Sequence, residues 1–504
     1  MIRNQQVLDY WPMDGVNLSV DPNVIPDSQC VSCQNMTFLF GEQKTLTKRL
    51  GSILNQTVTA GPIQAAIFFS LPGVAPIPIV AIRNAAGDQL WGGNPLAPMT
   101  GPTLAANGTW TLIEYAGVVY MFNGYSVYTT TSGTSYVEAT LPAYLPDIPL
   151  SGFIYLDRMY YRFSSDSPYA NSVYYSDVLA PLSMSFSTQN ITVGQFLGEN
   201  VTGMGYLSWA SAQTGPIGSL GIWKRNGMWV LTGDPVLSNS ALSQTSDITG
   251  CLNANTVVNT PAGTIWVSPD NIYLNQNGMN VPIGNNIFPA ILNIVGTGLS
   301  NQMFAVFHNN FYKLYLPDGQ GNIIGYWYNV LPKSDIQSGW YGPMTGINFS
   351  CMAVDPSDNW FGADNTAGNW YSLDADVYTD NGVSYNAILK TKVFDLKEFS
   401  LLKKFFISGF EGDAGGQGSL TIQTFFDGNP GGVYYFPYGQ PQSLWDVAQW
   451  DVNSYSGSSY FNNKVYFSPP VTSHNTQFII TQSDPFLFNM ERGMIVWAPS
   501  RKVA

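Results

Sequence analysis

Apolar and polar residues alternate along much of this chain in short runs that end at turn-forming residues. In residues 117–128, one alternating run is followed by Asn123-Gly124 and then by a second run. Alternation over about four to eight residues is typical of a half-buried strand. Asn-Gly favours a tight hairpin turn, because both central residues of a type I′ turn need positive φ. The pattern therefore predicts an antiparallel β-hairpin.

The same hairpin unit recurs along the chain. About 40 residues separate most neighbouring hairpins, and one gap, between the hairpins at Gly152 and Gly221, is nearer 70. A hairpin every 40–50 residues or so is the period of a β-propeller with four strands per blade. We therefore expect propeller-like repeated sheets, and the plainer alternative is an irregular stack of antiparallel sheets. The hairpins span residues 77–91, 117–128, 152–163, 221–231, 264–274, 304–315 and 359–371.

Helical periodicity is nearly absent, and the best helix candidate is the short stretch 286–295. The chain is therefore predicted to be all-β, with three parts. Residues 1–60 form an extended N-terminal arm or assembly segment that adds a strand to the last blade or to a neighbouring subunit. Residues 61–386 form the β-propeller-like domain. Residues 387–504, which begin near a group of five lysines, form a C-terminal β-sandwich-like domain with strands at 420–426, 433–438, 478–481 and 494–497.

Composition points to a protein that packs against other subunits. Charged residues make up only 11% of the chain, against about 25% in an average protein. Aromatic residues reach 14%, with 29 Tyr and 14 Trp. A surface with few charges and many aromatic side chains suits a subunit within an assembly better than a free monomer. We therefore expect large protein–protein interfaces.

The net charge of −13 argues against a dedicated nucleic-acid binder, which needs a basic footprint. It is compatible with DNA that passes without binding, because like charges repel a phosphate backbone. The lysines at 390–404 are interpreted as a solvated face or an interface patch. They are Lys390, Lys392, Lys397, Lys403 and Lys404.

Candidate chemistry is sparse. Cys30 and Cys33 are the one close pair among the four cysteines of the chain. A zinc site would need two more ligands, and the chain has only two histidines. All four cysteines are therefore expected to be small buried thiols. Neither His308 nor His474 lies in the context of a catalytic triad, and there is no P-loop or dinucleotide motif. We predict no catalytic, cofactor-binding or metal-binding residues.

The N-terminus lacks the apolar core of a signal peptide. Residues 51–82 carry no charge, but four prolines and the intervening polar residues argue against a membrane span. We therefore expect synthesis and assembly in a cytoplasm and no stable membrane insertion.

The N-terminal arm carries the most specific pattern in the chain. Its members, in order, are Gly15-Val16-Asn17, Asp21-Pro22, Asn35-Met36, Gly41, Lys48-Arg49 and Gly51. This order resembles the N-terminal signature of tail-nozzle or tail-stabilisation proteins of short-tailed bacteriophages, the head–tail connector accessory family. In that family the signature runs roughly Gly-Gly-Val/Leu-Asn, Asp with a nearby Pro, Asn-Val/Met, Gly, then Lys-Arg-Pro-Gly. Asp14 replaces the first Gly here, and Leu50 replaces the usual Pro.

The start of the C-terminal part resembles the family as well, through residues 392–396 followed by 403–405, and through residues 445–452. The resemblance covers both ends of the chain, and the middle only by its repeated hairpins. It implies a ring, expected to be a hexamer, below the portal and adaptor proteins of the virion tail. Such a ring continues the channel through which double-stranded genomic DNA is ejected, and it anchors tail fibres or spikes. No chemical step is required.

The arm residues also have a plain physical interpretation. Asp21-Pro22 and Asn35 are turn formers. Gly41 and Gly51 are expected to take positive φ. Lys48-Arg49 pair with a carboxylate of a neighbouring subunit or within their own core. Local structure alone is the alternative for the whole set: Gly15, Asn17, Asp21, Pro22, Asn35, Lys48, Arg49 and Gly51.

Two other functions remain open at this point. A glycan-binding or glycoside-hydrolysing propeller would use aromatic faces and paired carboxylates. Its candidate carboxylates lie in loops for which turn chemistry is the plainer interpretation; the loops could also hold calcium, although neither matches the EF-hand spacing. They are Asp355, Asp358, Asp364, Asp374 and Asp376. A tail-tip receptor-binding adhesin shares the composition, and only the N-terminal arm favours the nozzle over it.

Overall fold

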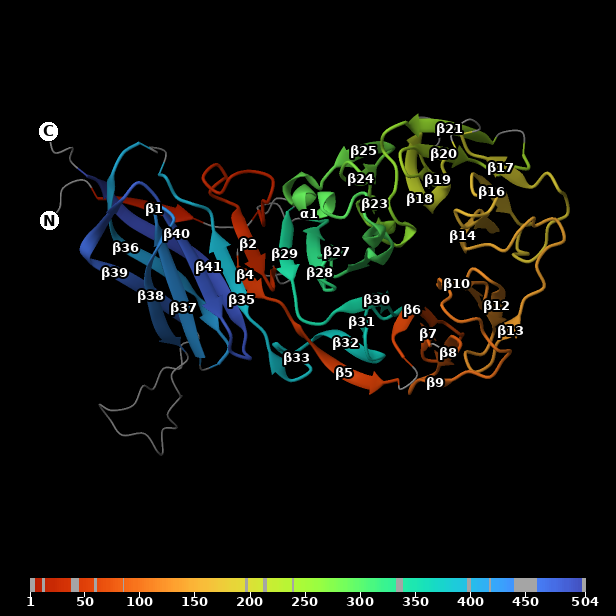
Figure 1. Cartoon of the computed structure of the whole chain (residues 1–504), viewed down its shortest axis with the longest axis horizontal. Helices are drawn as coiled ribbons and strands as arrows, with labels where there is room; N and C mark the ends of the chain where they lie inside the picture. Colours follow the sequence, from red (N-terminus) through yellow and green to blue (C-terminus); the bar gives the residue numbers. More distant parts are fainter. Residues whose placement is uncertain are drawn as a thin grey trace. The chain divides into compact units, whose positions relative to one another are not determined.

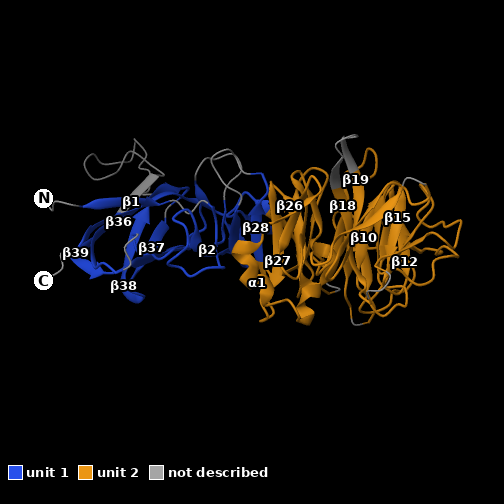
Figure 2. Cartoon of the chain, turned by 90° about the horizontal axis from the view of Figure 1, so that it is seen from above, with its two compact units in different colours: residues 1–53, 325–346, 374–504 blue, residues 54–324, 347–373 orange. Residues whose placement is uncertain are grey.

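The structure is a computed structural model that describes residues 5–10, 14–37, 45–58, 61–84, 86–194, 198–211, 215–237, 240–331, 339–396, 400–416, 418–438 and 460–500. Contacts divide the chain into two compact units (Figure 2). Unit 1 contains residues 1–53, 325–346 and 374–504, and unit 2 contains residues 54–324 and 347–373. Residues from the N-terminal segment and from the C-terminal segment therefore belong to the same unit.

Strands dominate the described residues. The helical elements among them are α1 (Phe288–Leu292) and three 3₁₀ turns, η1 (Ala254–Thr256), η2 (Asn285–Ile287) and η3 (Gly298–Gln302). Both α1 and η2 fall on the stretch where the sequence predicts a short helix. None of the described helices is long and apolar enough to cross a membrane.

Six antiparallel sheets, each with four strands in chain order, follow one another through the described residues. The first two are β6 (Ile63–Phe69), β7 (Ile77–Ile82), β8 (Gln89–Gly92), β9 (Ala97–Pro98); and β10 (Thr111–Tyr115), β11 (Val118–Phe122), β12 (Val127–Thr130), β13 (Val137–Glu138). The next two are β14 (Ser151–Tyr155), β15 (Arg158–Arg162), β16 (Ser172–Tyr175), β17 (Asn190–Thr192); and β18 (Val201–Ser211), β19 (Gly215–Lys224), β20 (Met228–Thr232), β21 (Ala241–Ser246). The last two are β22 (Val258–Thr260), β23 (Gly263–Val267), β24 (Ile272–Gln276), β25 (Met279–Pro282); and β26 (Phe304–His308), β27 (Phe311–Pro317), β28 (Ile323–Asn329), β29 (Trp340–Met344).

The seventh sheet closes the ring with a strand from the other end of the chain. It begins with β30 (Phe349–Val354), β31 (Trp360–Asp364) and β32 (Asn369–Ala375), and β5 (Gly51–Thr57) pairs with β32. The Thr57 hydroxyl donates to Asn369 Oδ1 at 2.7 Å, and the Val58 N–H donates to Gly368 O at 2.9 Å. The expected addition of an arm strand to the last blade is confirmed.

The first strands of the seven sheets contact one another in a closed cycle within unit 2, from β6 through β10, β14, β18, β22, β26 and β30 back to β6 (Figure 1). Each sheet buries its faces against its neighbours in this cycle. One core cluster, for example, joins Ile79 and Leu90 of the first sheet to Val119 and Met121 of the second. This is a β-propeller, so the predicted fold class is confirmed and the irregular-stack alternative is wrong.

Turn chemistry explains the hairpins. Asn309 and Asn310 join β26 to β27, and both have positive φ, at 49° and 62°, as a type I′ turn requires. The longer gap between the hairpins at Gly152 and Gly221 does not contain an additional sheet. The first of these hairpins is the β14–β15 pair that opens its sheet, whereas the second is the β19–β20 pair in the middle of the next sheet.

Unit 1 is a β-sandwich. One sheet has the order β2 (Cys30–Gln34), β35 (Ala387–Thr391), β40 (Thr476–Gln482), β37 (Gly418–Phe426), β38 (Asn429–Tyr438). The other has the order β3 (Met36–Thr37), β4 (Leu46–Lys48), β41 (Phe488–Pro499), β36 (Lys403–Ala414), β39 (Tyr460–Ser473), with β1 (Gln6–Tyr10) also pairing with β41. Two short strands, β33 (Thr379–Asp380) and β34 (Val383–Ser384), form a hairpin beside β5, where Asp380 pairs with Ser52. The N-terminal arm thus supplies strands to both sandwich sheets.

Candidate functional site

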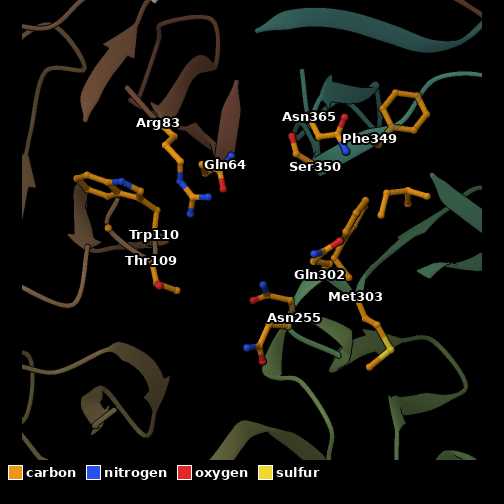
Figure 3. Close-up of a pocket in the computed structure, with 14 residues that line it drawn as sticks. Gln64, Arg83, Thr109, Trp110, Asn255, Gln302, Met303, Phe349, Ser350 and Asn365 are labelled. Carbon is orange, nitrogen blue, oxygen red and sulfur yellow. The ribbon is translucent and has the colours of Figure 1, made fainter. Parts of the chain in front are cut away.

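Unit 2 contains a cavity of about 480 Å³ at the end of the ring where its first strands begin (Figure 3). Gln64 comes from β6, Thr109 precedes β10, and Phe349 opens β30. The size is typical of a small-ligand site. The remaining lining residues are Arg83, Gly108, Trp110, Asn255, Asn301, Gln302, Met303, Phe304, Ile323, Ser350 and Asn365.

The lining is mostly polar, and many of its polar side chains are not engaged. Figure 3 shows Arg83 extending toward the middle of the cavity, with Asn255 and Gln302 on another side. Arg83, Asn255 and Gln302 are exposed, and no hydrogen bond joins any of these three side chains to another described residue. Asn365 Oδ1 is buried and has no hydrogen-bond partner among the described residues. The cavity therefore presents free donors and acceptors.

Two carboxylates lie behind this lining, and their oxygens are already occupied. Asp88 Oδ2 accepts from the Gly108 N–H and from the Trp110 indole N–H, both at 2.8 Å. Asp88 Oδ1 accepts from the backbone of Asn84 and Asn107. Both carboxylate oxygens hold the loop that forms one wall of the cavity, so Asp88 acts as a structural support there.

Asp364 plays the same part on the opposite wall, beside Asn365. Its Oδ1 accepts from the backbone N–H groups of Thr366 and Ala367, and its Oδ2 accepts from Asn369 Nδ2 at 2.6 Å. Among the described lining residues, Arg83 is the one charged side chain. No Asp or Glu occurs among the described lining residues, so they hold no carboxylate pair of the kind that hydrolyses glycosides.

The other candidate groups mostly serve turns and cores. Asp355 accepts from the N–H groups of Ser357 and Asn359, both at 2.8 Å, and Asp358 takes a positive φ of 65°. His308 is 3% exposed, and its ring contacts Lys313 Nζ at 3.2 Å. No group of three His, Cys, Asp or Glu side chains in the described ranges could hold a metal ion. The four cysteines are free and buried, as expected: Cys30, Cys33, Cys251 and Cys351.

The sequence-selected residues lie elsewhere, within unit 1. Gly15 has φ of 81°, and a Cβ atom there would come within 2.0 Å of Trp340 O. The Asn17 amide donates to Gln29 Oε1 at 2.8 Å, and Asp21 Oδ1 caps a turn at the Asn23 N–H. Pro22 O accepts from the Val393 N–H at 3.0 Å. The contacts of these arm residues thus all lie within the same chain.

Asn35, Lys48 and Arg49 come together in a buried polar group that we call the Arg49 cluster, completed by Thr345, Asp380 and Tyr385. Arg49 Nη1 donates to Asp380 Oδ1 at 3.1 Å, and Nη2 donates to Asp380 Oδ2. Arg49 Nε donates to Asn35 Oδ1 at 3.2 Å, while Nη2 also donates to Thr345 O at 2.9 Å. The guanidinium lies 4.0 Å from the centre of the Tyr385 ring. The arginine is therefore paired within its own chain.

Lys48 is fully buried on β4. Its ammonium donates to Gln482 Oε1 at 3.1 Å and to Asp484 O at 2.7 Å. Burial, with a further contribution from the positive charge of Arg49, lowers the pKa of Lys48 to about 8. Desolvation disfavours the charged form of a buried amine.

Gly51 requires a correction. It does not take positive φ; it is small because the backbone passes close by, and a Cβ atom would come within 2.0 Å of Thr379 O. Gly41 lies outside the described residues, as do Lys397 and the stretch 445–452. Of the other clustered lysines, Lys403 is buried and Lys392 pairs with Asp27 at 2.8 Å.

Sequence reasoning missed the partners of the Arg49 cluster and the whole cavity lining. Thr345, Asp380 and Tyr385 lie about 300 residues from Arg49 along the chain, and no local pattern links them to it. Arg83 belongs to no motif. The only available signal was a general rule, which predicts that a buried arginine has a carboxylate partner but not which carboxylate it is.

Comparison with known proteins places the chain in no family. No family model matches it, and no curated protein matches it. Among solved structures, an exo-β-1,3-galactanase from Phanerochaete chrysosporium with β-1,3-galactotriose is 11% identical, with a TM-score of 0.28 over 79% of this chain and 98% of that chain. The streptogramin B lyase structure is 11% identical, with a TM-score of 0.35 over 64% and 97%. YCF48 bound to D1 peptide is 12% identical, with a TM-score of 0.37 over 68% and 98%. At these TM-scores the likenesses carry no argument about what this chain does, and its own sheet topology establishes the propeller.

Proposed function

We propose that the chain is a structural subunit of a virion tail, in which copies form a ring, expected to be a hexamer, that continues the DNA-ejection channel below the portal and adaptor. The observation that carries the proposal is the ordered residue set of the arm, from Gly15 to Gly51, which resembles the signature of tail-nozzle proteins. In this fold some described members of that set tie the arm to later parts of unit 1: Pro22 O accepts from the Val393 N–H, and Arg49 pairs with Asp380.

The surface supports an assembled state. Several large apolar side chains of unit 1 are mostly exposed, including Tyr435 at 72% and Val383 at 69%. In unit 2, Met279 is 68% exposed and Leu179 is 67% exposed. In a ring, subunit interfaces would cover exposed side chains of this kind, whose aromatic and methionine members are enriched at such interfaces. The ring subunit would carry out no chemical step, and its acidic net charge would let DNA slide past.

The test uses particles from the source of the gene. Purified virions are labelled with gold-conjugated antibodies against the full chain and viewed by electron microscopy. The proposal predicts label at the tail, at the vertex through which DNA leaves. Label on the capsid shell, or virions that lack the chain, would overturn it. Label at the distal tip of fibres would favour the receptor-binding adhesin instead.

A second candidate function, glycan binding by unit 2, is favoured by one observation: the cavity lined by unengaged amide side chains. The lining speaks for binding rather than hydrolysis, because its carboxylate neighbours Asp88 and Asp364 are occupied by backbone donors. Release of sugar by the purified chain, lost on removal of one specific carboxylate, would instead establish a hydrolase.

A further inference from the structure

The cavity of unit 2 differs from most small-molecule sites, which are lined mainly by apolar side chains. Five of its lining side chains are amides, and two more carry hydroxyl groups. An amide both donates and accepts hydrogen bonds, as a sugar hydroxyl does. The amide members are Gln64, Asn255, Asn301, Gln302 and Asn365, and the hydroxyl members are Thr109 and Ser350.

Charge narrows the ligand class. Arg83 is exposed, and it is the one charged residue of the described lining. Its guanidinium pairs with no other described residue. A planar guanidinium binds a carboxylate through two parallel hydrogen bonds. The oxygens of Asp88 and Asp364 accept from backbone, indole and amide N–H groups, and neither carboxylate forms an ion pair with Arg83. A neutral ligand that filled the cavity would remove water from the guanidinium without pairing it.

We propose that this cavity binds an acidic saccharide, a sugar that carries a carboxylate. The carboxylate pairs with Arg83, and the ring hydroxyls bind the surrounding amides. The inference goes beyond the ring role, and it rests on the second candidate function, to which it gives a ligand class.

The experiment is a calorimetric titration of the full chain. The ligands are D-glucuronate, D-galacturonate and trimers of galacturonate, with glucose, galactose and neutral galactose trimers as matched controls. We expect at least one acidic sugar to bind at least about tenfold more tightly than its neutral counterpart, which corresponds to about 1.4 kcal/mol. Raising the salt concentration should weaken this preference. Equal affinity for neutral sugars, or no binding by any of these ligands, would overturn the proposal.

Variants separate the roles of the lining residues. Arg83→Gln should abolish the preference for the acidic sugar, whereas Arg225→Gln, on the turn between β19 and β20 and outside the lining, should retain it. Asn365→Leu should weaken the binding of acidic and of neutral sugars to the same extent. Persistence of the preference in Arg83→Gln would contradict the proposal.

The last ligand in the titration is inorganic phosphate. Phosphate carries charge but has no ring of hydroxyls, so it should bind more weakly than the acidic sugar. If phosphate bound as tightly, the cavity would be a simple anion site and the proposal would be wrong. Gold labelling of virions reports on the ring role and does not depend on any sugar, so the two proposals can fail separately.

Discussion

Two arginines, one in each unit, show how differently this chain uses charge. Arg49 is buried and fully paired, with Asp380 on one side and Asn35 and Thr345 on the other. Arg83 is exposed and unpaired within the described residues, and it lines a polar cavity. Arg49, which belongs to a sequence motif, uses its hydrogen bonds within the fold. Arg83, which belongs to no motif, is accessible to a ligand. A motif charge is therefore no guide to where this protein meets its partners.

The largest expected effect follows from breaking the paired arginine. Arg49→Met leaves Asp380 buried without its partner, which typically costs about 3–5 kcal/mol. Chemical denaturation, followed by the signals of unit 1, measures the change in the free energy of unfolding. Arg492 serves as the control, because its contact with Asp9 is exposed at 41% and 43%. Arg492→Gln should cost at most about 1 kcal/mol, and an equal loss in both variants would refute the distinction.

The next effect tests how closely the arm is packed. Gly15→Ala must accommodate both positive φ and a Cβ atom that overlaps Trp340 O. Gly73→Ala must accommodate only the positive φ, of 76°, because no atom lies within 4 Å of the Cβ that would be added there. Gly15→Ala should therefore lose about 1–3 kcal/mol more than Gly73→Ala in thermal unfolding, as overpacked sites do. Similar losses would mean that the arm tolerates movement there.

A pH series tests the buried lysine of the same cluster. The pKa of Lys48 is lowered to about 8 in the folded chain, while an unfolded lysine titrates near 10.4 or so. Between these values the unfolded state binds more protons, so the stability of the wild type rises with pH. Relative to Lys48→Met, the wild type should gain up to about 2 kcal/mol from pH 7 to 9.5. A stability difference that does not change over this range would show that Lys48 is not desolvated.

The smallest effect on stability is expected in the cavity. Arg83 has no partner within the described residues to lose, so Arg83→Gln should change the free energy of unfolding by no more than about 0.5 kcal/mol. Its consequence should appear only in ligand binding. A loss comparable to that of Arg49→Met would mean that Arg83 supports the fold.

The hairpins of the fold could be predicted from the sequence, because local residue patterns determine where hairpins form. The Asn309-Asn310 turn and the alternating strands on both sides of it occur where the pattern places them. The short helix near residue 288 was likewise predictable. The short fourth strands of several sheets were not, because strands such as β13 and β9 have only two residues and leave no periodic signal.

The candidate site was predictable only in part, because long-range partners leave no local trace. The sequence marks Asn35, Lys48 and Arg49 as a group, but it does not reveal that Asp380 completes them. The cavity gathers residues from strands and turns spread from Gln64 to Asn365, and single amides in loops look the same whether they line a cavity or face solvent. Only the closed cycle of first strands brings them together.

The claim that the chain is a ring subunit is tested most directly by electron cryomicroscopy of the intact virion tail. The account predicts several copies of the propeller and of the sandwich arranged about the tail axis, around an open channel wide enough for duplex DNA. A map in which the chain lies away from the DNA path, or occurs as a single copy at a fibre tip, would contradict it.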